Sequence, residues 1–277
     1  MTRVIDIESV PLIERQHVRE GVFRAQTLLT GEPNTAGNFA LVLSSMPHTY
    51  YSPRHRHNFD QVRFQIEGEF DFDSDGKMGP GMVAYFPEGT PYGPQSSASS
   101  SLTLVLQFGG ASRSGYLSSE QYEKAQAELM TMGTFSKGVY TRVTPDGRKL
   151  NKDAYQAVWE HVNGRPLVYP APRYARPVFM APEHFAWLPL AGEPGASRKR
   201  LGEFTECRAR LALYRVDEGS RLQLEDHSLY FVISGSGAVD GNRFAKYATI
   251  HAGMSERPTA TAKEPAELLQ LGLPYLS

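Results

Sequence analysis

The chain has little cysteine, no long apolar run and almost no net charge. Cys207 is the single cysteine among 277 residues, so no disulfide can form within the chain. No apolar run approaches the roughly 20 residues that a membrane-spanning helix needs. Residues 1–6 lack the apolar core of a signal peptide. We therefore expect a cytoplasmic protein that does not enter a membrane.

The balance of charge argues against a nucleic-acid partner. The 29 basic residues are matched by 30 acidic residues, which gives a formal net charge of −1. Nucleic-acid binding normally requires a basic surface. The sequence also contains neither a phosphate-binding loop nor a Gly-x-Ser-x-Gly nucleophile turn. We therefore expect no nucleic-acid partner and no chemistry of either of these two kinds.

Turn-forming residues are abundant, with 25 glycines and 19 prolines. They separate short segments that are rich in β-branched and aromatic residues, which is typical of strands. In the first half these segments are 39–43, 81–87 and 102–108; in the second half they are 178–180, 208–214, 229–233 and 248–250. This spacing favours an all-β chain built as a barrel or a sandwich.

A different pattern occupies residues 113–170. Ser118 and Gln121 fit a capping box, which predicts a helix over 118–132. A second helix is predicted over 152–162, with polar turns and a proline-rich run around the two. We interpret 113–170 as a connector that packs on the β domains.

The stretch from Pro53 to Gly68 holds two histidines one residue apart. Successive side chains of a strand point to opposite faces, so His55 and His57 would share a face. Two imidazoles on one face can bind one metal ion. The alternative is a hydrogen-bonded barrel interior that holds no ion.

This stretch resembles the first motif of the cupin superfamily. That motif has His-x-His, three or four residues, Glu, six residues and Gly. Here His55 and His57 are followed by Gln61 and Gly68 at that spacing. Gln61 stands where the family has an acidic residue, and Thr49 stands where it has a leading glycine.

A later stretch resembles the second cupin motif, which has Gly, five residues, Pro-x-Gly, two residues and His. Gly81, Pro87 and Gly89 keep this spacing, and Tyr92 replaces the histidine. Together the motifs cover residues 38–110, and they are specific for the superfamily but not for one activity.

The second half of the sequence is similar to the first, since the residues before Gly235 resemble those before Gly68. This alignment puts Leu222 and Leu224 at the two histidine positions and Ser228 at the Gln61 position. The resemblance thus implies a bicupin, with two double-stranded β-helix (jelly-roll) barrels. We expect an N-terminal barrel over 1–112, the connector over 113–170, and a degenerate, structural C-terminal barrel over 171–277.

The resemblance also implies a ligand set for a divalent metal ion in the first barrel. His55 and His57 would bind it, assisted by the carbonyl oxygen of Gln61 and by Tyr92. Gln95 is an alternative to Tyr92, which could instead be a proton donor or acceptor in catalysis. Iron, manganese, zinc and nickel are not distinguished.

Strand parity adds a substrate site. If the histidines point inward, Phe59, Gln61, Arg63 and Gln65 do so as well. An inward Arg63 could clamp a carboxylate and take part in catalysis. We expect Arg63, Gln65 and Gln95 to bind substrate. The opposite parity places Val62, Phe64 and Ile66 outward, where the connector, the other barrel or a second subunit of a homodimer would cover them.

The expected function is that of a metal-dependent cupin enzyme. Its substrate would be a small oxygenated organic molecule with negative charge, and the resemblance leaves dioxygenase, isomerase, lyase and hydrolase open. A dioxygenase is slightly favoured, because few protein ligands leave open positions on a metal. The alternative is a non-catalytic bicupin that binds a small molecule.

Overall fold

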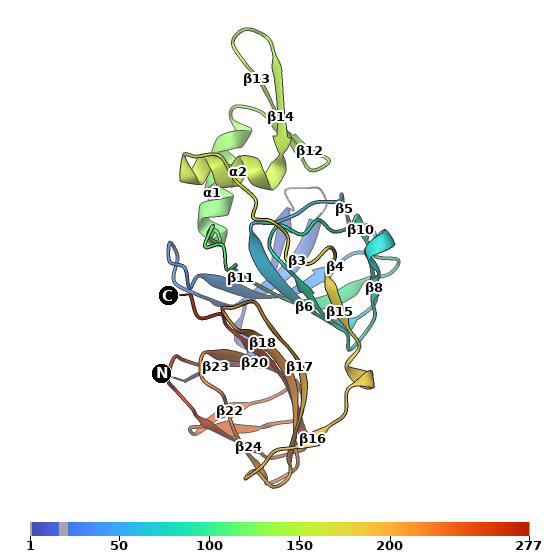
Figure 1. Cartoon of the computed structure of the whole chain (residues 1–277), viewed down its shortest axis with the longest axis vertical. Helices are drawn as coiled ribbons and strands as arrows, with labels where there is room; N and C mark the ends of the chain where they lie inside the picture. Colours follow the sequence, from blue (N-terminus) through green and yellow to red (C-terminus); the bar gives the residue numbers. More distant parts are fainter. Residues whose placement is uncertain (1, 17–21, 277) are drawn as a thin grey trace. The chain divides into compact units, whose positions relative to one another are not determined.

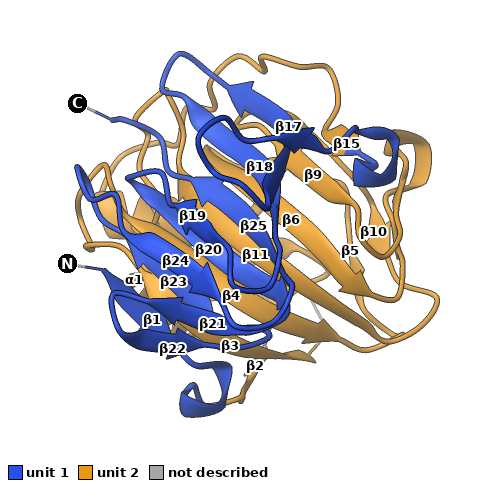
Figure 2. Cartoon of the chain, turned by 90° about the horizontal axis from the view of Figure 1, so that it is seen from below, with its two compact units in different colours: residues 1–11, 180–277 blue, residues 12–179 orange. Residues whose placement is uncertain are grey.

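The computed structural model describes residues 2–16 and 22–276, which form two compact units. Unit 1 comprises Met1–Pro11 and Met180–Ser277, and unit 2 comprises Leu12–Phe179 (Figure 2). These limits differ from the expected domain limits at 112 and 171. The first residues belong with the C-terminal barrel because strand β1 (Arg3–Ile5) pairs with β23 (Thr249–Ala252). The expected connector lies within unit 2.

Unit 2 contains a seven-stranded and a four-stranded antiparallel sheet among its described residues (Figure 1). The large sheet has the order β15 (Val178–Met180), β9 (Val83–Phe86), β6 (Phe59–Glu67), β11 (Ser101–Gly109), β4 (Phe39–Met46), β3 (Val22–Thr30) and β2 (Ile13–Gln16). The small sheet has the order β5 (Tyr51–Ser52), β10 (Gln95–Ser96), β7 (Phe70–Asp71) and β8 (Lys77–Met78). A 3-10 turn, η2 (Asp73–Asp75), lies between β7 and β8.

Unit 1 repeats this architecture in its described part. Its large sheet has the order β1, β23, β20 (Ser228–Ser234), β25 (Ala266–Gly272), β18 (Ala209–Val216), β17 (Ala196–Phe204) and β16 (Leu188–Pro189). Its small sheet has the order β19 (Arg221–Gln223), β24 (Thr259–Ala262), β21 (Gly237–Val239) and β22 (Asn242–Phe244). Two 3-10 turns, η1 (Ile7–Ser9) and η3 (Pro182–His184), complete the unit.

Position by position, the strand orders of the two units correspond. The central strand β6 lies between β9 and β11, as β20 lies between β23 and β25. Two jelly-roll barrels from one repeated β pattern, as predicted from the similarity of the two halves, are confirmed. Strands β3, β17 and β25 were not predicted from the sequence.

One glycine in each barrel shows why the repeat is visible in the sequence. Gly68 and Gly235 follow β6 and β20 with φ angles of +72° and +82°. A Cβ atom at Gly68 would lie 2.5 Å from the carbonyl oxygen of Ser100, and one at Gly235 would lie 2.3 Å from that of Pro265. Only glycine accepts both the left-handed backbone and the close approach.

The connector holds two helices and a small sheet. Helix α1 (Ser119–Met130) begins with the predicted capping box, and α2 (Ala154–Asn163) begins at the cap residue Asp153. Between them lies a sheet of β12 (Thr134–Ser136), β13 (Val139–Val143) and β14 (Lys149–Asp153), where only polar turns were predicted. The hairpin of β13 and β14 projects beyond the helices (Figure 1).

Helix α2 and the segment before α1 are tied to the barrel of unit 2 through one buried side chain. Asn58 donates from Nδ2 to the carbonyl oxygen of Gly115 at 3.1 Å and accepts from the Tyr155 hydroxyl at 2.9 Å. Asn58 itself is 0% exposed. Since it stands between His57 and Phe59, the connector is held beside the histidine motif.

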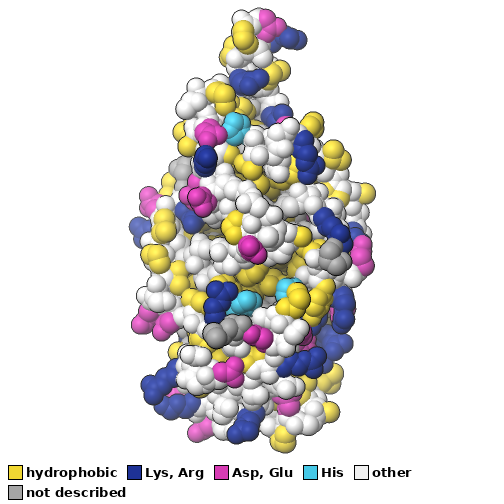
Figure 3. All heavy atoms as spheres, turned by 90° about the vertical axis from the view of Figure 1, so that its left-hand side faces the viewer, with side chains coloured by type: hydrophobic (Ala, Val, Ile, Leu, Met, Phe, Trp, Pro, Cys, Tyr) yellow, Lys and Arg dark blue, Asp and Glu magenta, His cyan; other side chains and the backbone are white. Residues whose placement is uncertain are grey.

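Charges of both signs are mixed on the face of the molecule in Figure 3, and no single-sign patch dominates it. This agrees with the net charge of −1. Among the described helices, none is long and apolar enough to span a membrane.

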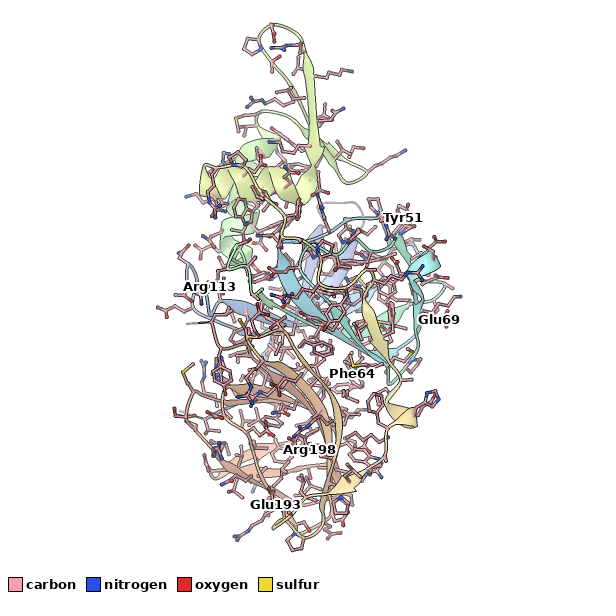
Figure 4. All side chains as sticks on the ribbon, viewed as in Figure 1. Tyr51, Phe64, Glu69, Arg113, Glu193 and Arg198 are labelled. Carbon is pink, nitrogen blue, oxygen red and sulfur yellow. The ribbon has the colours of Figure 1, made fainter. Side chains whose placement is uncertain are left out.

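The outward face of β6 is buried, as parity predicted. Val62 is 2% exposed and Phe64, labelled in Figure 4, is 4% exposed. Asp60 on the same face accepts hydrogen bonds from the Glu88 N–H at 2.8 Å and the Tyr85 hydroxyl at 2.9 Å. Burial raises the pKa of Asp60 to about 7, and the nearby Glu88 carboxylate adds to the shift.

We predict that Asp60→Asn stabilises the protein at neutral pH and removes a pH dependence. The folded state retains a proton on Asp60 that the unfolded chain releases near pH 3.8. Wild-type stability should therefore fall as pH rises from about 4 to about 7, with a slope from this group of up to about 1.4 kcal/mol per pH unit. Urea unfolding at half-unit pH steps measures both effects.

Asp73→Asn is the matched control, because Asp73 is exposed and its φ of +55° is one that asparagine accepts. It should follow the wild-type pH profile. If Asp60→Asn also follows that profile, the protonated buried carboxyl is contradicted.

Candidate ligand site of the first barrel

The backbone joins the two cupin-like segments directly. His55 and Tyr92 form an isolated bridge, with N–H···O distances of 3.1 and 2.9 Å. The N–H of Gly89 donates to the carbonyl oxygen of His57 at 2.8 Å. The histidines therefore precede β6 and do not lie within it, which corrects the prediction of one continuous strand from the histidines onward.

The imidazole of His55 is oriented by a bond to the backbone. Its Nδ1 lies 2.6 Å from the carbonyl oxygen of Pro53, which can only accept, so Nδ1 carries the hydrogen. Nε2 is then the acceptor for the Tyr92 hydroxyl at 3.1 Å. A metal-binding histidine is oriented in the same way, with one ring N–H donated to a carbonyl.

His57 lies beside His55, with 4.9 Å between the ring centroids. Its ring stacks on Phe59 at 4.4 Å and meets Tyr155 of α2 at 5.5 Å. His55 and His57 are 9% and 8% exposed. Both predicted imidazoles are therefore brought together at a nearly buried position.

Arg63 lies farther along β6 and is held by two amide oxygens. Its Nε donates to Gln61 Oε1 at 2.7 Å, and its Nη1 donates to Gln95 Oε1 at 2.5 Å. The guanidinium carbon is 4.8, 5.5 and 5.7 Å from the ring centroids of Phe86, Phe72 and Tyr92. Aromatic faces attract a cation at such distances.

These partners fix Arg63 without neutralising it. The side chain is 9% exposed and forms no ion pair with any described residue. Only two of its five N–H donors reach an acceptor within the described part of the chain. A buried charge normally has a charged partner, so the remaining donors present an uncompensated positive charge.

Arg63 faces a cavity of about 640 Å³ in unit 2. His57, Phe59 and Gln61 line the same cavity, in agreement with the inward parity predicted for them, whereas His55 and Gln65 do not line it. Its volume is typical of sites for small organic ligands.

The other predicted site residues lie behind the cavity wall. His55, Gln65, Tyr92 and Gln95 do not line it, and the last three are at most 1% exposed. The amide of Gln65 is already used, since it accepts from Thr103 at 2.9 Å and donates to the carbonyl oxygen of Glu67 at 2.7 Å. Gln65 is thus not placed to bind a substrate, and Gln95 positions Arg63.

Some residues of the cavity wall were not predicted from the sequence, because they lie outside the two motifs. The connector contributes Tyr116, Leu117, Tyr155 and one face of α1, and β2 contributes another part of the wall. The amphipathic pattern of α1 predicts that one face is covered, but it does not say by what.

The donors near the histidines would make a lean ligand set for a metal ion. No group of three or more His, Cys, Asp or Glu that could hold a metal occurs among residues 2–16 and 22–276. Nε2 of His55 and the Tyr92 oxygen fit an ion, since donor atoms 3.1 Å apart can both lie about 2.1 Å from it. The His57 ring lies beside them, with 4.9 Å between the centroids of the two imidazoles. Gln61 fits poorly, because its oxygen already accepts from a cation.

The described residues of the second barrel form no comparable site. Leu222 and Leu224 are fully buried in its hydrophobic core. Two of its arginines have a carboxylate partner: Arg198, labelled in Figure 4, and Arg210 pair with Glu225 at 3.0 and 3.1 Å. Burial alone would raise the pKa of Glu225, but the hydrogen bond from Gln270 and the charge of Arg210 hold it below its usual range.

Solved structures match the chain over nearly its whole length. A proposed dioxygenase of Nostoc punctiforme has a TM-score of 0.62 at 11% identity and covers 98% of this chain and 81% of its own. Oxalate decarboxylase of Bacillus subtilis has a TM-score of 0.57 at 14% identity and covers 98% and 76%. The chain has the two-barrel cupin fold.

A third match is GK1651 of Geobacillus kaustophilus, with a TM-score of 0.53 at 15% identity, covering 100% of this chain and 99% of that one. No protein-family model matches the chain, and a comparison with curated proteins found no significant match. At these identities the matches establish the cupin fold, and the function must be argued from the site.

We predict that Tyr92→Phe lowers the free energy of unfolding by about 1 kcal/mol, because Nε2 of the buried His55 loses its donor. Chemical denaturation measures the change. Tyr51→Phe is the control, since Tyr51 is 51% exposed and should cost almost nothing. Equal stability of the two variants would mean that the hydroxyl of Tyr92 does not support His55.

Proposed function

We propose that the first barrel is the site of a metal-dependent cupin enzyme that acts on a small, oxygenated, negatively charged organic molecule. The observation that carries the proposal is the buried guanidinium of Arg63, which faces a cavity and has no carboxylate partner among the described residues. An anionic group on the substrate would supply the missing partner.

The unused donors of Arg63 suit a carboxylate. A guanidinium offers N–H groups in a planar fork that matches two carboxylate oxygens. Because Gln61 and Gln95 already hold Nε and Nη1, the fork is fixed before the ligand arrives. Less conformational entropy is then lost on binding.

The metal would be held by His55, His57 and Tyr92. When bound, a divalent ion supplies a Lewis acid that polarises a substrate oxygen, and a redox-active iron also allows chemistry with O₂. The rest of the work falls to the chain. Arg63 orients the anion and the aromatic wall excludes water. The hydrogen bond that the Tyr92 hydroxyl donates to His55 Nε2 at 3.1 Å would be replaced by the two bonds to the metal when the ion binds.

The similar structures support an oxidative or decarboxylating reaction without choosing between them. One is named as a proposed dioxygenase and another as oxalate decarboxylase. We favour a dioxygenase slightly, because the lean ligand set leaves coordination positions open. Oxygen uptake with enol, catechol and keto-acid substrates tests this choice.

A non-catalytic bicupin that binds the same anion is the second candidate. The amide at position 61 favours it, because the residue type that would strengthen a metal site is absent there. Binding of an anion with neither metal retention nor turnover would select this candidate.

We predict that the protein retains about one ion per chain after incubation with at least one of Fe²⁺, Mn²⁺, Zn²⁺ and Ni²⁺ and desalting. His55→Ala and His57→Ala should retain none, because each removes an imidazole donor. His184→Ala is the control, since its side chain is 78% exposed. Elemental analysis measures the ion, and a wild type without metal under all four conditions contradicts the metal part of the proposal.

We predict that Gln61→Glu raises the affinity for a metal ion and lowers the affinity for a carboxylate ligand. A carboxylate at this position adds an anionic metal ligand and also pairs with Arg63. Metal affinity should rise at least about tenfold, and affinity for a carboxylate such as hexanoate should fall by a similar factor. Calorimetric titration measures both.

Gln107→Glu is the matched control. Gln107 faces Gln61 across the pair of β6 and β11 and lines the same cavity, but its oxygen accepts from Tyr116 and not from Arg63. It adds the same charge without the ion pair. Identical behaviour of the two variants would contradict the role given to Gln61.

A further inference from the structure

The cavity around Arg63 has room for far more than a carboxylate. Its volume is about 640 Å³, whereas a water molecule occupies about 30 Å³ in the liquid. A two-carbon acid would leave most of it unfilled. The residues that line the rest of the cavity therefore indicate the chemical character of the rest of the ligand.

Most of the remaining wall is apolar. Side chains from several strands and from the connector face the cavity: Val42, Met46, Phe59, Phe70, Val105 and Leu117. An apolar wall favours an apolar ligand body, since binding then removes apolar surface from water on both partners.

The other charges of the wall are already paired. Arg15 forms an ion pair with Glu123 at 3.1 Å, and Glu14 lies 3.8 Å from Arg24. Arg63 is thus the one lining residue whose charge has no partner of opposite sign in the described chain. One uncompensated positive charge calls for one negative charge on the ligand.

Helix α1 closes part of this apolar wall. Ser119, Tyr122, Gln126, Ala127 and Met130 all face the cavity. Their spacing of three and four residues places them on one face of the helix. The connector, which lies outside both cupin motifs, is therefore placed to contact the body of the ligand.

We propose that the site takes an amphipathic monocarboxylate, whose carboxylate binds Arg63 and whose apolar body fills the cavity against α1. This rests on the proposed anion site and deepens it by adding the body of the ligand. It assigns α1 a part in substrate selection.

The test is a calorimetric titration of the full chain with acetate, butanoate, hexanoate and octanoate, and with hexanamide as the neutral analogue. Affinity should rise roughly two- to fourfold for each added methylene, and hexanamide should bind at least tenfold more weakly than hexanoate. If acetate binds as tightly as octanoate, the apolar body is contradicted while the anion site stands. If hexanamide equals hexanoate, or if no acid binds, the anion site itself fails.

A variant of α1 tests the contact with the helix. Ala127 is an exposed residue of the cavity-facing side, so Ala127→Trp fills space without disturbing the core. It should weaken octanoate binding at least tenfold and leave butanoate within about twofold. Lys124→Trp, at an exposed position of α1 that does not line the cavity, should change neither. Equal effects of the two variants on octanoate would overturn the assignment of α1.

Discussion

The guanidinium of Arg63, held inside the first barrel by two amide oxygens and by aromatic faces, is the interaction on which the account depends. An arginine in such a place costs free energy unless a negative charge comes to it. Gln61 and Gln95 fix its position and leave its charge in place. The amide at position 61, which weakens the metal site, is therefore also what keeps Arg63 available. The proposed affinities for a metal and for an anion would therefore both depend on this one side chain.

The second barrel has the same architecture but no buried arginine that corresponds to Arg63 among its described residues. Its arginines Arg198 and Arg210 share Glu225, so the chain itself supplies the negative charge. Leucines fill the positions that correspond to the two histidines. The same strand order therefore surrounds two different interiors. In the second barrel arginines pair with a carboxylate of the chain, and in the first Arg63 faces a cavity without a carboxylate partner among the described residues. Fold and site are separable here, which is why similar structures at 11–15% identity establish the first and not the second.

Much of the fold could be predicted because the two motifs fix glycines whose backbone conformation no other residue accepts, as at Gly68. Inward parity from Phe59 to Arg63 followed from the pleat of β6. The sequence could not show that Gln61 bonds to Arg63 and not to a metal, because that choice depends on side-chain geometry. Nor could it show that α1 forms a cavity wall, since amphipathicity marks a covered face and not its neighbour.

Unfolding of wild type and Arg63→Met, with and without octanoate, tests the central claim most directly. If Arg63 is an uncompensated charge that a carboxylate neutralises, octanoate raises the wild-type melting temperature. It then leaves that of the variant unchanged, and the ligand-free variant is at least as stable as wild type. A ligand-free variant that is much less stable than wild type, together with equal stabilisation of both proteins by octanoate, would contradict the claim.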